Sequence, residues 1–236
     1  MHFLLLPGIN NTAATFDGTR RHMPSAHAAK AVDLPALPDV DQIAQAVLAD
    51  APERFVVVGH SFGGYVALAI LAAAPERVNG VVLVNSNDWS DSATAAAGRE
   101  DKAQQAEAGA YADLADKASA RAYHPDNAGR PDLMAERAAA LTGYGAARFA
   151  AHQRASAARP DRGALLASCG KPVLIVTGDH DVVIPTERQT QMAERLGAAQ
   201  VIVAQAGHML PAEQPQSLAT ALTDWAAAQF PVSEGA

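Results

Sequence analysis

The chain has 236 residues, 49% of them hydrophobic, and a formal net charge of −7. This length is enough for one domain with a full core, or for one domain with an inserted subdomain. The acidic balance, without a cluster of Lys and Arg, argues against a nucleic-acid partner and against binding to anionic membranes. Cys169 is the only cysteine, so no internal disulfide forms, and the apolar stretch at residues 2–6 is too short to cross a membrane. We therefore expect a cytoplasmic protein.

Apolar patterning predicts alternating strands and helices in the first third of the chain. Unbroken apolar runs indicate strands buried on both faces, and apolar residues at helical spacing indicate amphipathic helices. This alternation predicts a mostly parallel sheet of about six strands with helices on both faces. The predicted elements of this part are strands over residues 3–6, 30–34, 55–58 and 78–84 and helices over residues 40–49 and 65–74.

The composition changes over residues 87–166, where β-branched residues nearly vanish and Ala, Arg, Asp and Gln dominate. Short helices are expected there, among them 133–141 and 146–157, and aromatic anchors such as Trp89 argue against disorder. The sheet pattern then resumes with strands over 173–177 and 201–203 and helices over 186–196 and 218–230. The sequence therefore predicts a core made of residues 1–86 and 167–236, into which a helical cap of residues 87–166 is inserted.

One turn between a predicted strand and a predicted helix has the spacing of a reactive serine. Gly59 and Gly63 flank Ser61 at two residues on either side. So tight a turn forces its middle residue into a strained conformation, commonly with φ > 0, and exposes its side chain. A Cβ at either glycine position would clash with the neighbouring strand and helix. We therefore predict that Ser61 is a catalytic nucleophile on a nucleophile elbow.

A serine hydroxyl is a poor nucleophile at neutral pH and needs an adjacent base that a third group orients. His208 follows the predicted strand over 201–203 directly after a glycine. Because parallel strands bring their carboxyl ends to one edge of the sheet, His208 can meet Ser61 despite the distance in sequence. We predict that His208 is the base.

Three carboxylates follow predicted strands and are candidates for the third group. Asp179 and Asp181 come after the strand over 173–177, and Asp88 comes after the strand over 78–84. The remaining histidines lack the spacing of metal ligands, so we expect no metal site and no cofactor.

An acyl-transfer reaction also needs donors for the oxyanion. The backbone N–H of Phe62 begins the helix after Ser61, where free amides and the helix dipole favour negative charge. A second donor is expected from the loop after the first strand, most simply the N–H of Ile9, next to Pro7-Gly8.

Taken together, these residues resemble the α/β-hydrolase superfamily over essentially the whole chain, and in particular its small esterase-like members with a helical cap. The chain order Ser, Asp, His is the one that this fold uses. The motifs that carry the resemblance are Gly59-His60-Ser61-Phe62-Gly63-Gly64, Leu5-Leu6-Pro7-Gly8, Gly178-x-x-Asp181-x-x-x-Pro185 and Gly207-His208-Met209-Leu210-Pro211-x-Glu213-Gln214-Pro215.

The resemblance implies that Asp181 is the acid of the triad. It also implies that the first two of the family's usual eight strands are missing, since the chain starts at the strand of the oxyanion loop. Serine at position 61 argues against the dehalogenases and epoxide hydrolases of the superfamily, which use aspartate. Asn10 stands where many relatives carry apolar residues, and together with Trp89 of the cap it is a candidate for the substrate pocket.

The predicted activity is hydrolysis of a carboxylic ester or lactone of a small molecule, as in a carboxylesterase or lactonase. The same triad also serves carbon–carbon bond hydrolysis, lyase, perhydrolase and acyl-transfer chemistry, because function belongs to the site and not to the fold. A ligand-binding protein without catalysis is a further alternative. The sequence predicts no oligomeric state.

Overall fold

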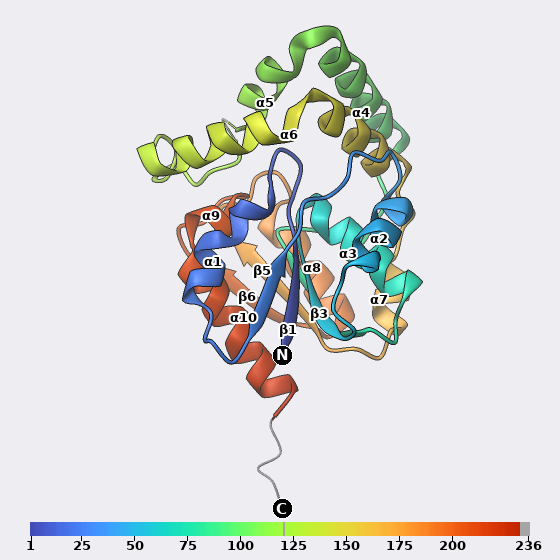
Figure 1. Cartoon of the computed structure of the whole chain (residues 1–236), viewed down its shortest axis with the longest axis vertical. Helices are drawn as coiled ribbons and strands as arrows, with labels where there is room; N and C mark the ends of the chain where they lie inside the picture. The colour runs from blue at the N-terminus through green and yellow to red at the C-terminus, as the bar shows by residue number, and fades with distance from the viewer. Residues whose placement is uncertain (120, 232–236) are drawn as a thin grey trace, which may run out of the picture.

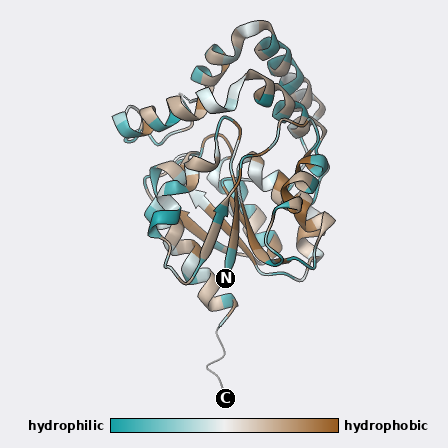
Figure 2. Cartoon of the chain, viewed as in Figure 1, coloured by the Kyte–Doolittle hydropathy of each residue, from teal (hydrophilic) through white to brown (hydrophobic). Residues whose placement is uncertain are grey.

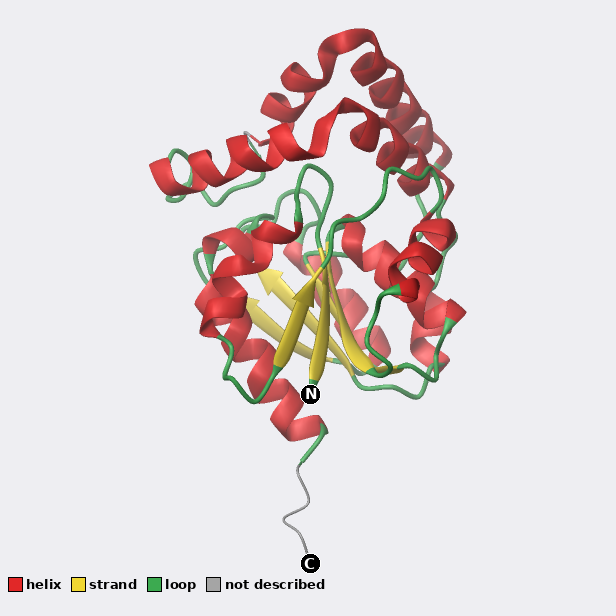
Figure 3. Ribbon diagram, viewed as in Figure 1, coloured by secondary structure: helices red, strands yellow, loops and turns green. Residues whose placement is uncertain are grey.

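A computed structural model describes residues 1–119 and 121–231 of the chain. Its centre is one six-stranded sheet with the order β2-β1-β3-β4-β5-β6, and every neighbouring pair of strands is parallel. Figures 1 and 3 show this twisted sheet with helices on both sides. The predicted fold class is therefore confirmed. The strands are β1 (His2–Leu6), β2 (Ala28–Ala31), β3 (Phe55–His60), β4 (Val78–Val84), β5 (Val173–Gly178) and β6 (Ala199–Val203).

The sheet is buried on both faces, as its continuous apolar strands require. Leu4 and Leu6 of β1 pack into the core on one face, and Phe3 and Leu5 pack into the core on the other. Figure 2 shows apolar residues, in brown, along the strands and on neighbouring helices. The first face is covered by α2 (Val40–Ala49), α3 (Phe62–Ala73), α7 (Gly163–Ser168) and α8 (Thr186–Leu196), and the second by η1 (Ala13–Phe16), α1 (Asp17–His22), α9 (Leu210–Glu213) and α10 (Pro215–Gln229).

Some predicted boundaries differ from the structure. The strand predicted over 30–34 is β2 at Ala28–Ala31, because the chain leaves the sheet edge after the Val32 N–H donates to the Leu5 carbonyl. Helix α3 begins at Phe62, three residues earlier than predicted, because the helix starts directly after the turn at Ser61. The predicted ranges 40–49, 78–84 and 186–196 coincide with α2, β4 and α8.

A helical segment lies over the carboxyl ends of the strands (Figures 1 and 3). Gly145, with φ 77 and ψ 164, breaks its longest helix between the two predicted helical stretches 133–141 and 146–157. The division of the chain into a core and an inserted cap stays a prediction. No helix in residues 1–119 or 121–231 combines the length and the apolar character that crossing a membrane requires. The segment consists of α4 (Ala93–Gln105), η2 (Ala106–Ala110), α5 (Tyr111–Ser119) and α6 (Pro131–Ala158).

Candidate active site

The turn from β3 to α3 holds Ser61 in a strained conformation. Its backbone angles are φ 52 and ψ −118, in a region that residues other than glycine rarely adopt. A Cβ on Gly59 would come within 2.4 Å of the Gly63 carbonyl oxygen, and one on Gly63 within 2.1 Å of the Leu6 carbonyl oxygen. Both expectations about this turn, the positive φ and the need for glycine on either side, agree with the structure.

Ser61, His208 and Asp181 converge at the carboxyl edge of the sheet. The Ser61 Oγ atom lies 2.9 Å from His208 Nε2. On the other side of the imidazole, Nδ1 lies 3.1 Å from Asp181 Oδ1 and 3.0 Å from Oδ2. His208 and Asp181 are buried, and Ser61 is partly exposed to a cavity. One ring nitrogen can therefore contact the hydroxyl while the other is held by a carboxylate.

The Asp181 carboxylate is fixed by the loop that follows β5. Its Oδ1 accepts hydrogen bonds from the backbone N–H groups of Val183 and Ile184, at 2.9 and 3.0 Å. Its Oδ2 accepts one from the side chain of Gln189 on α8, at 3.1 Å. These three donors hold the orientation of the carboxylate. Gln189 was not singled out from the sequence, since one polar residue on an amphipathic helix gives no signal.

The two other candidate acids are engaged elsewhere. The carboxylate of Asp179 accepts hydrogen bonds from both N–H groups of residues 205–206, at 3.1 Å each, and so ties the ends of β5 and β6 together. The carboxylate of Asp88 pairs with Arg195 at 2.6 Å. Of the three, only Asp181 contacts the imidazole of His208.

Asn85 and Ser86, at the end of β4, organise the loops around the site. The Asn85 side chain donates to the carbonyls of Gly207 and His208, at 2.8 and 3.0 Å, and accepts from the N–H of Gly178, at 2.8 Å. The Ser86 hydroxyl donates to the Ser61 carbonyl at 2.7 Å. Sequence reasoning placed the end of a strand here but assigned these side chains no role. Their position at the carboxyl edge of the sheet was the available signal.

His60, next to Ser61, is fully buried and lies against His208. Its Nε2 contacts the His208 carbonyl at 2.8 Å, which requires that this nitrogen carries the proton. Burial, and then repulsion from the nearby His208, lower the pKa of His60 to about 3. His60 is therefore neutral and donates a hydrogen bond that holds the backbone of His208.

The loop after β1 approaches the serine closely. A Cβ on Gly8 would lie 3.1 Å from the Ser61 Cβ, and the side chain of Asn11 donates to the Ile9 carbonyl at 2.9 Å. Among the described residues, neither the Ile9 N–H nor the Phe62 N–H donates a hydrogen bond. Both predicted oxyanion donors are therefore free, and both residues line the cavity at Ser61.

A cavity of about 690 Å³ opens beside Ser61, between the sheet edge and the helical segment. Asn10 and Trp89, the two predicted pocket residues, both line it. Tyr123 also lines the cavity, whereas Tyr144 packs against Ala106 and Phe149 and contacts His152. In the described part of the chain, His, Cys, Asp and Glu side chains form no cluster of three that could hold a metal.

The parallel sheet and the strained serine turn at its carboxyl edge form the arrangement of the α/β-hydrolase fold. Residues 3–221 match the Alpha/beta hydrolase family, and the chain belongs to that family. One relative is the pimeloyl-(acyl-carrier protein) methyl ester esterase of Vibrio parahaemolyticus, which is 36% identical over 92 residues. That match spans 36% of this chain and only 36% of the relative.

Two solved structures have the same fold. A thermophilic esterase from Thermogutta terrifontis superposes with a TM-score of 0.91 at 23% identity, covering 97% of this chain and 90% of its own. The enol-lactonase from Burkholderia xenovorans superposes with a TM-score of 0.83 at 20% identity, covering 95% of this chain and 90% of its own. At these identities, the likeness establishes the fold.

Proposed function

We propose that this protein hydrolyses a carboxylic ester or a lactone of a small molecule through a triad of Ser61, His208 and Asp181. The observation that carries the proposal is the contact of 2.9 Å between Ser61 Oγ and His208 Nε2, with Asp181 bound to the opposite nitrogen. The names of the similar proteins, two esterases and an enol-lactonase, support the ester and lactone classes. A cytoplasmic location, expected from the composition, belongs to the same proposal.

In the first half of the reaction, Ser61 Oγ attacks the carbonyl carbon while His208 Nε2 takes the hydroxyl proton. Asp181 stabilises the imidazolium that forms and keeps the proton on Nδ1. The negative charge on the carbonyl oxygen is stabilised by the N–H groups of Ile9 and Phe62. His208 then returns the proton to the leaving alcohol oxygen, and the acyl group stays on Ser61 as an ester.

In the second half, water replaces the alcohol. His208 Nε2 takes a proton from the water as its oxygen attacks the acyl carbon, and the same two amides hold the oxyanion. The Ser61 oxygen leaves and recovers the proton from His208, which releases the carboxylic acid. With a lactone, the leaving alcohol and the acid are two ends of one product.

The test compares wild type with Ser61→Ala on p-nitrophenyl acetate and on a lactone. We expect Ser61→Ala to lose turnover by a factor of about 10⁴ or more, since a triad without its nucleophile keeps little activity. Ser168→Ala, at an exposed position of α7 outside the cavity, is the matched control and should keep full turnover. Undiminished turnover by Ser61→Ala would refute the proposal.

A second measurement separates ester hydrolysis from the other chemistries of the same triad. Wild type is labelled with a fluorophosphonate, with Ser61 as the expected site, and is then assayed on esters, lactones and 1,3-diketones side by side. Cleavage of the diketones alone would assign carbon–carbon bond hydrolysis instead. Failure of the probe to label Ser61 would point to a protein that binds a ligand without catalysis.

A further inference from the structure

The cavity beside Ser61 has the opposite charge to the rest of the protein. The chain contains 18 Lys and Arg against 25 Asp and Glu. Among the described residues that line the cavity, seven are Lys or Arg, and Asp91 is the only acid. Positive charges that line a concave site focus the electrostatic potential there and attract anionic ligands. The charge of the cavity therefore needs an explanation that the overall charge does not give.

Three of these cations are held by carboxylates. Arg159 pairs with Asp91 at 2.8 Å, and Arg99 forms a second, close ion pair with the same residue. Burial alone would raise the pKa of Asp91, but the hydrogen bonds from Arg159 and Arg99 lower it overall, so this carboxylate is ionised. One charge thus compensates two guanidinium groups. Arg137, from α6, pairs at 2.5 Å with Asp116.

The other four cations form no ion pair with any described residue. They are Lys102, Lys117, Arg121 and Arg188. Arg188, on α8, lies with its guanidinium carbon 4.6 Å from the centre of the Trp89 ring. The ring contacts the guanidinium, and no described residue accepts a hydrogen bond from its N–H groups. Such an oriented fork of donors matches a carboxylate or a phosphate.

Part of the cavity lining is apolar. Phe62 follows the serine directly, and Ile9 and Phe149 add further apolar surface to the lining. A ligand that fits both parts has, besides its reacting carbonyl, an apolar segment and a negative charge. Binding energy from such non-reacting groups can be used to position the reacting bond.

We propose that the cavity binds an ester that carries a second, anionic group, a carboxylate or a phosphate, and that Arg188 is the main contact of that group. This proposal rests on the proposed ester hydrolysis and names its substrate class. Lys102, Lys117 and Arg121 supply additional positive potential at the same cavity. Arg188 acts in binding, so its removal should raise KM more than it lowers kcat.

The kinetic test uses pairs of substrates that differ in one charge. Monomethyl esters of straight-chain dicarboxylic acids, from succinate to suberate, are compared with the corresponding dimethyl esters. Acetylglycerol phosphate is compared with acetylglycerol. We expect the anionic member of at least one pair to have a kcat/KM about tenfold higher, and we expect added salt to reduce this preference. A preference in the first pair identifies a carboxylate, and one in the second a phosphate. Equal or lower kcat/KM for the anionic member of both pairs would overturn the proposal.

Two variants assign the preference to its residue. Arg188→Gln should lower the ratio of kcat/KM between the anionic and the neutral ester about five- to tenfold, mainly through KM. Arg54→Gln removes the same charge from an exposed position before β3, outside the cavity, and should leave the ratio unchanged. An unchanged ratio in Arg188→Gln, or an equal fall in both variants, would contradict the role given to Arg188.

A binding measurement separates this proposal from the proposed function. Ser61→Ala is titrated by calorimetry with monomethyl glutarate, dimethyl glutarate and the two glycerol compounds. We expect the anionic member of the preferred pair to bind about tenfold more tightly. If wild type cleaves no ester but this binding preference exists, ester hydrolysis is wrong and the anion site stands. Equal binding of charged and neutral members in both pairs would overturn the anion site, whatever the turnover.

Discussion

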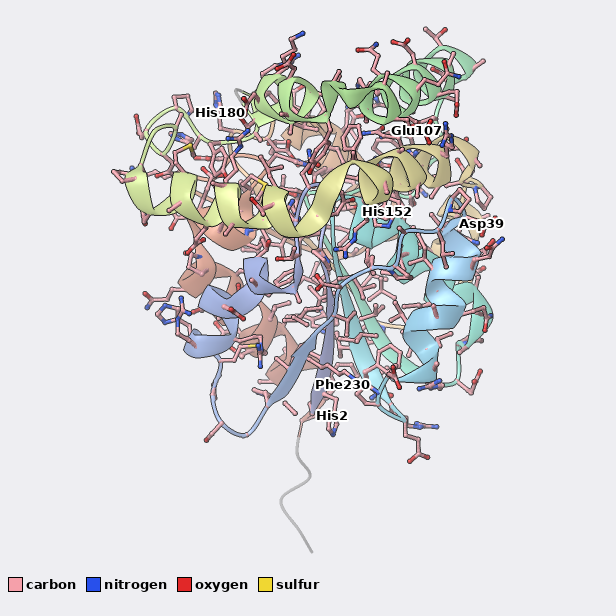
Figure 4. All side chains as sticks on the ribbon, turned by 45° about the horizontal axis from the view of Figure 1, so that its top comes forward. His2, Asp39, Glu107, His152, His180 and Phe230 are labelled. Carbon is pink, nitrogen blue, oxygen red and sulfur yellow. The ribbon has the colours of Figure 1, made fainter. Side chains whose placement is uncertain are left out.

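Tyr111, at the start of α5, donates a hydrogen bond from its hydroxyl to Asn10 Oδ1 at 3.2 Å, across 101 residues of sequence. Asn10 follows Ile9, the proposed oxyanion donor, and has a positive φ of 63. This bond links the helical segment to the loop that carries this proposed donor. A second contact joins the helical segment to the start of α3, because the His152 ring stacks on Phe62 with centroids 4.5 Å apart. Figure 4 shows His152 beneath the ribbon of α6.

The first prediction concerns Tyr111→Phe. Losing one hydrogen bond of ~1 kcal/mol that orients the oxyanion loop should lower kcat about fivefold, with a smaller change in KM. Tyr144→Phe offers a contrast, because it leaves the buried Nδ1 of His152 without its partner and should cost about 1–3 kcal/mol of stability. Steady-state kinetics and urea unfolding measure both effects. Full kcat in Tyr111→Phe would show that the loop keeps its geometry without the bond.

The second prediction distinguishes the three candidate acids. Asp181→Asn should lower kcat by about 10³- to 10⁴-fold, because the amide no longer stabilises the imidazolium or fixes its tautomer. Asp179→Asn, whose carboxylate bonds only backbone N–H groups, should lose about 1 kcal/mol of stability and little activity. Turnover and unfolding are measured on both variants. A larger loss of kcat in Asp179→Asn than in Asp181→Asn would contradict this assignment.

The third prediction tests the close approach of α3 to the loop after β1. Gly63→Ala would place a Cβ 2.1 Å from the Leu6 carbonyl oxygen, which is backbone and cannot rotate away. We expect a loss of more than about 3 kcal/mol in the free energy of unfolding, or failure to fold. Gly98→Ala on α4 is the matched control, since nothing lies within 4 Å of the added Cβ. It should raise the stability by about 0.5–1 kcal/mol. Equal stability of the two variants would be evidence against the packing of this turn.

The fourth prediction concerns acid pH. Burial, as the largest cause in both cases, lowers the pKa of His60 to about 3 and that of His152 to about 4, from an ordinary value of 6.5. Between the lowered and the ordinary pKa, the unfolded chain binds protons that the folded protein does not. The free energy of unfolding should therefore fall as the pH drops below about 6.5, by up to about 1.4 kcal/mol per pH unit for each histidine.

Urea unfolding at about pH 7 and about pH 5 measures this slope. His60→Asn and His152→Gln each remove one of the two groups, so each variant should lose less stability between the two pH values than wild type does. The same loss in both variants and in wild type would assign the acid sensitivity to other groups.

The amino-acid sequence by itself determined the strands, the main helices and their order. Three predicted ranges, 40–49, 78–84 and 186–196, coincide with observed elements, because apolar periodicity and turn residues act over a few positions. The strained turn at Ser61 was also predictable, since the two flanking glycines and the change from strand to helix are local features. Boundaries at exposed edges, such as β2, were less predictable, because pairing with a neighbouring strand decides where they end.

Only the tertiary structure decided which distant side chains meet. Among three carboxylates in comparable positions, contact with His208 distinguishes Asp181, and the support from Asn85 and Gln189 follows from how separate loops pack together. The grouping of the cations around the cavity could not be predicted from the sequence for the same reason. They are scattered over α4, α5, α6, α8 and the segments that follow α5 and α6, and form no cluster along the chain, yet they line one cavity. Local preferences specify elements, whereas the shape and charge of a site depend on how those elements are packed in space.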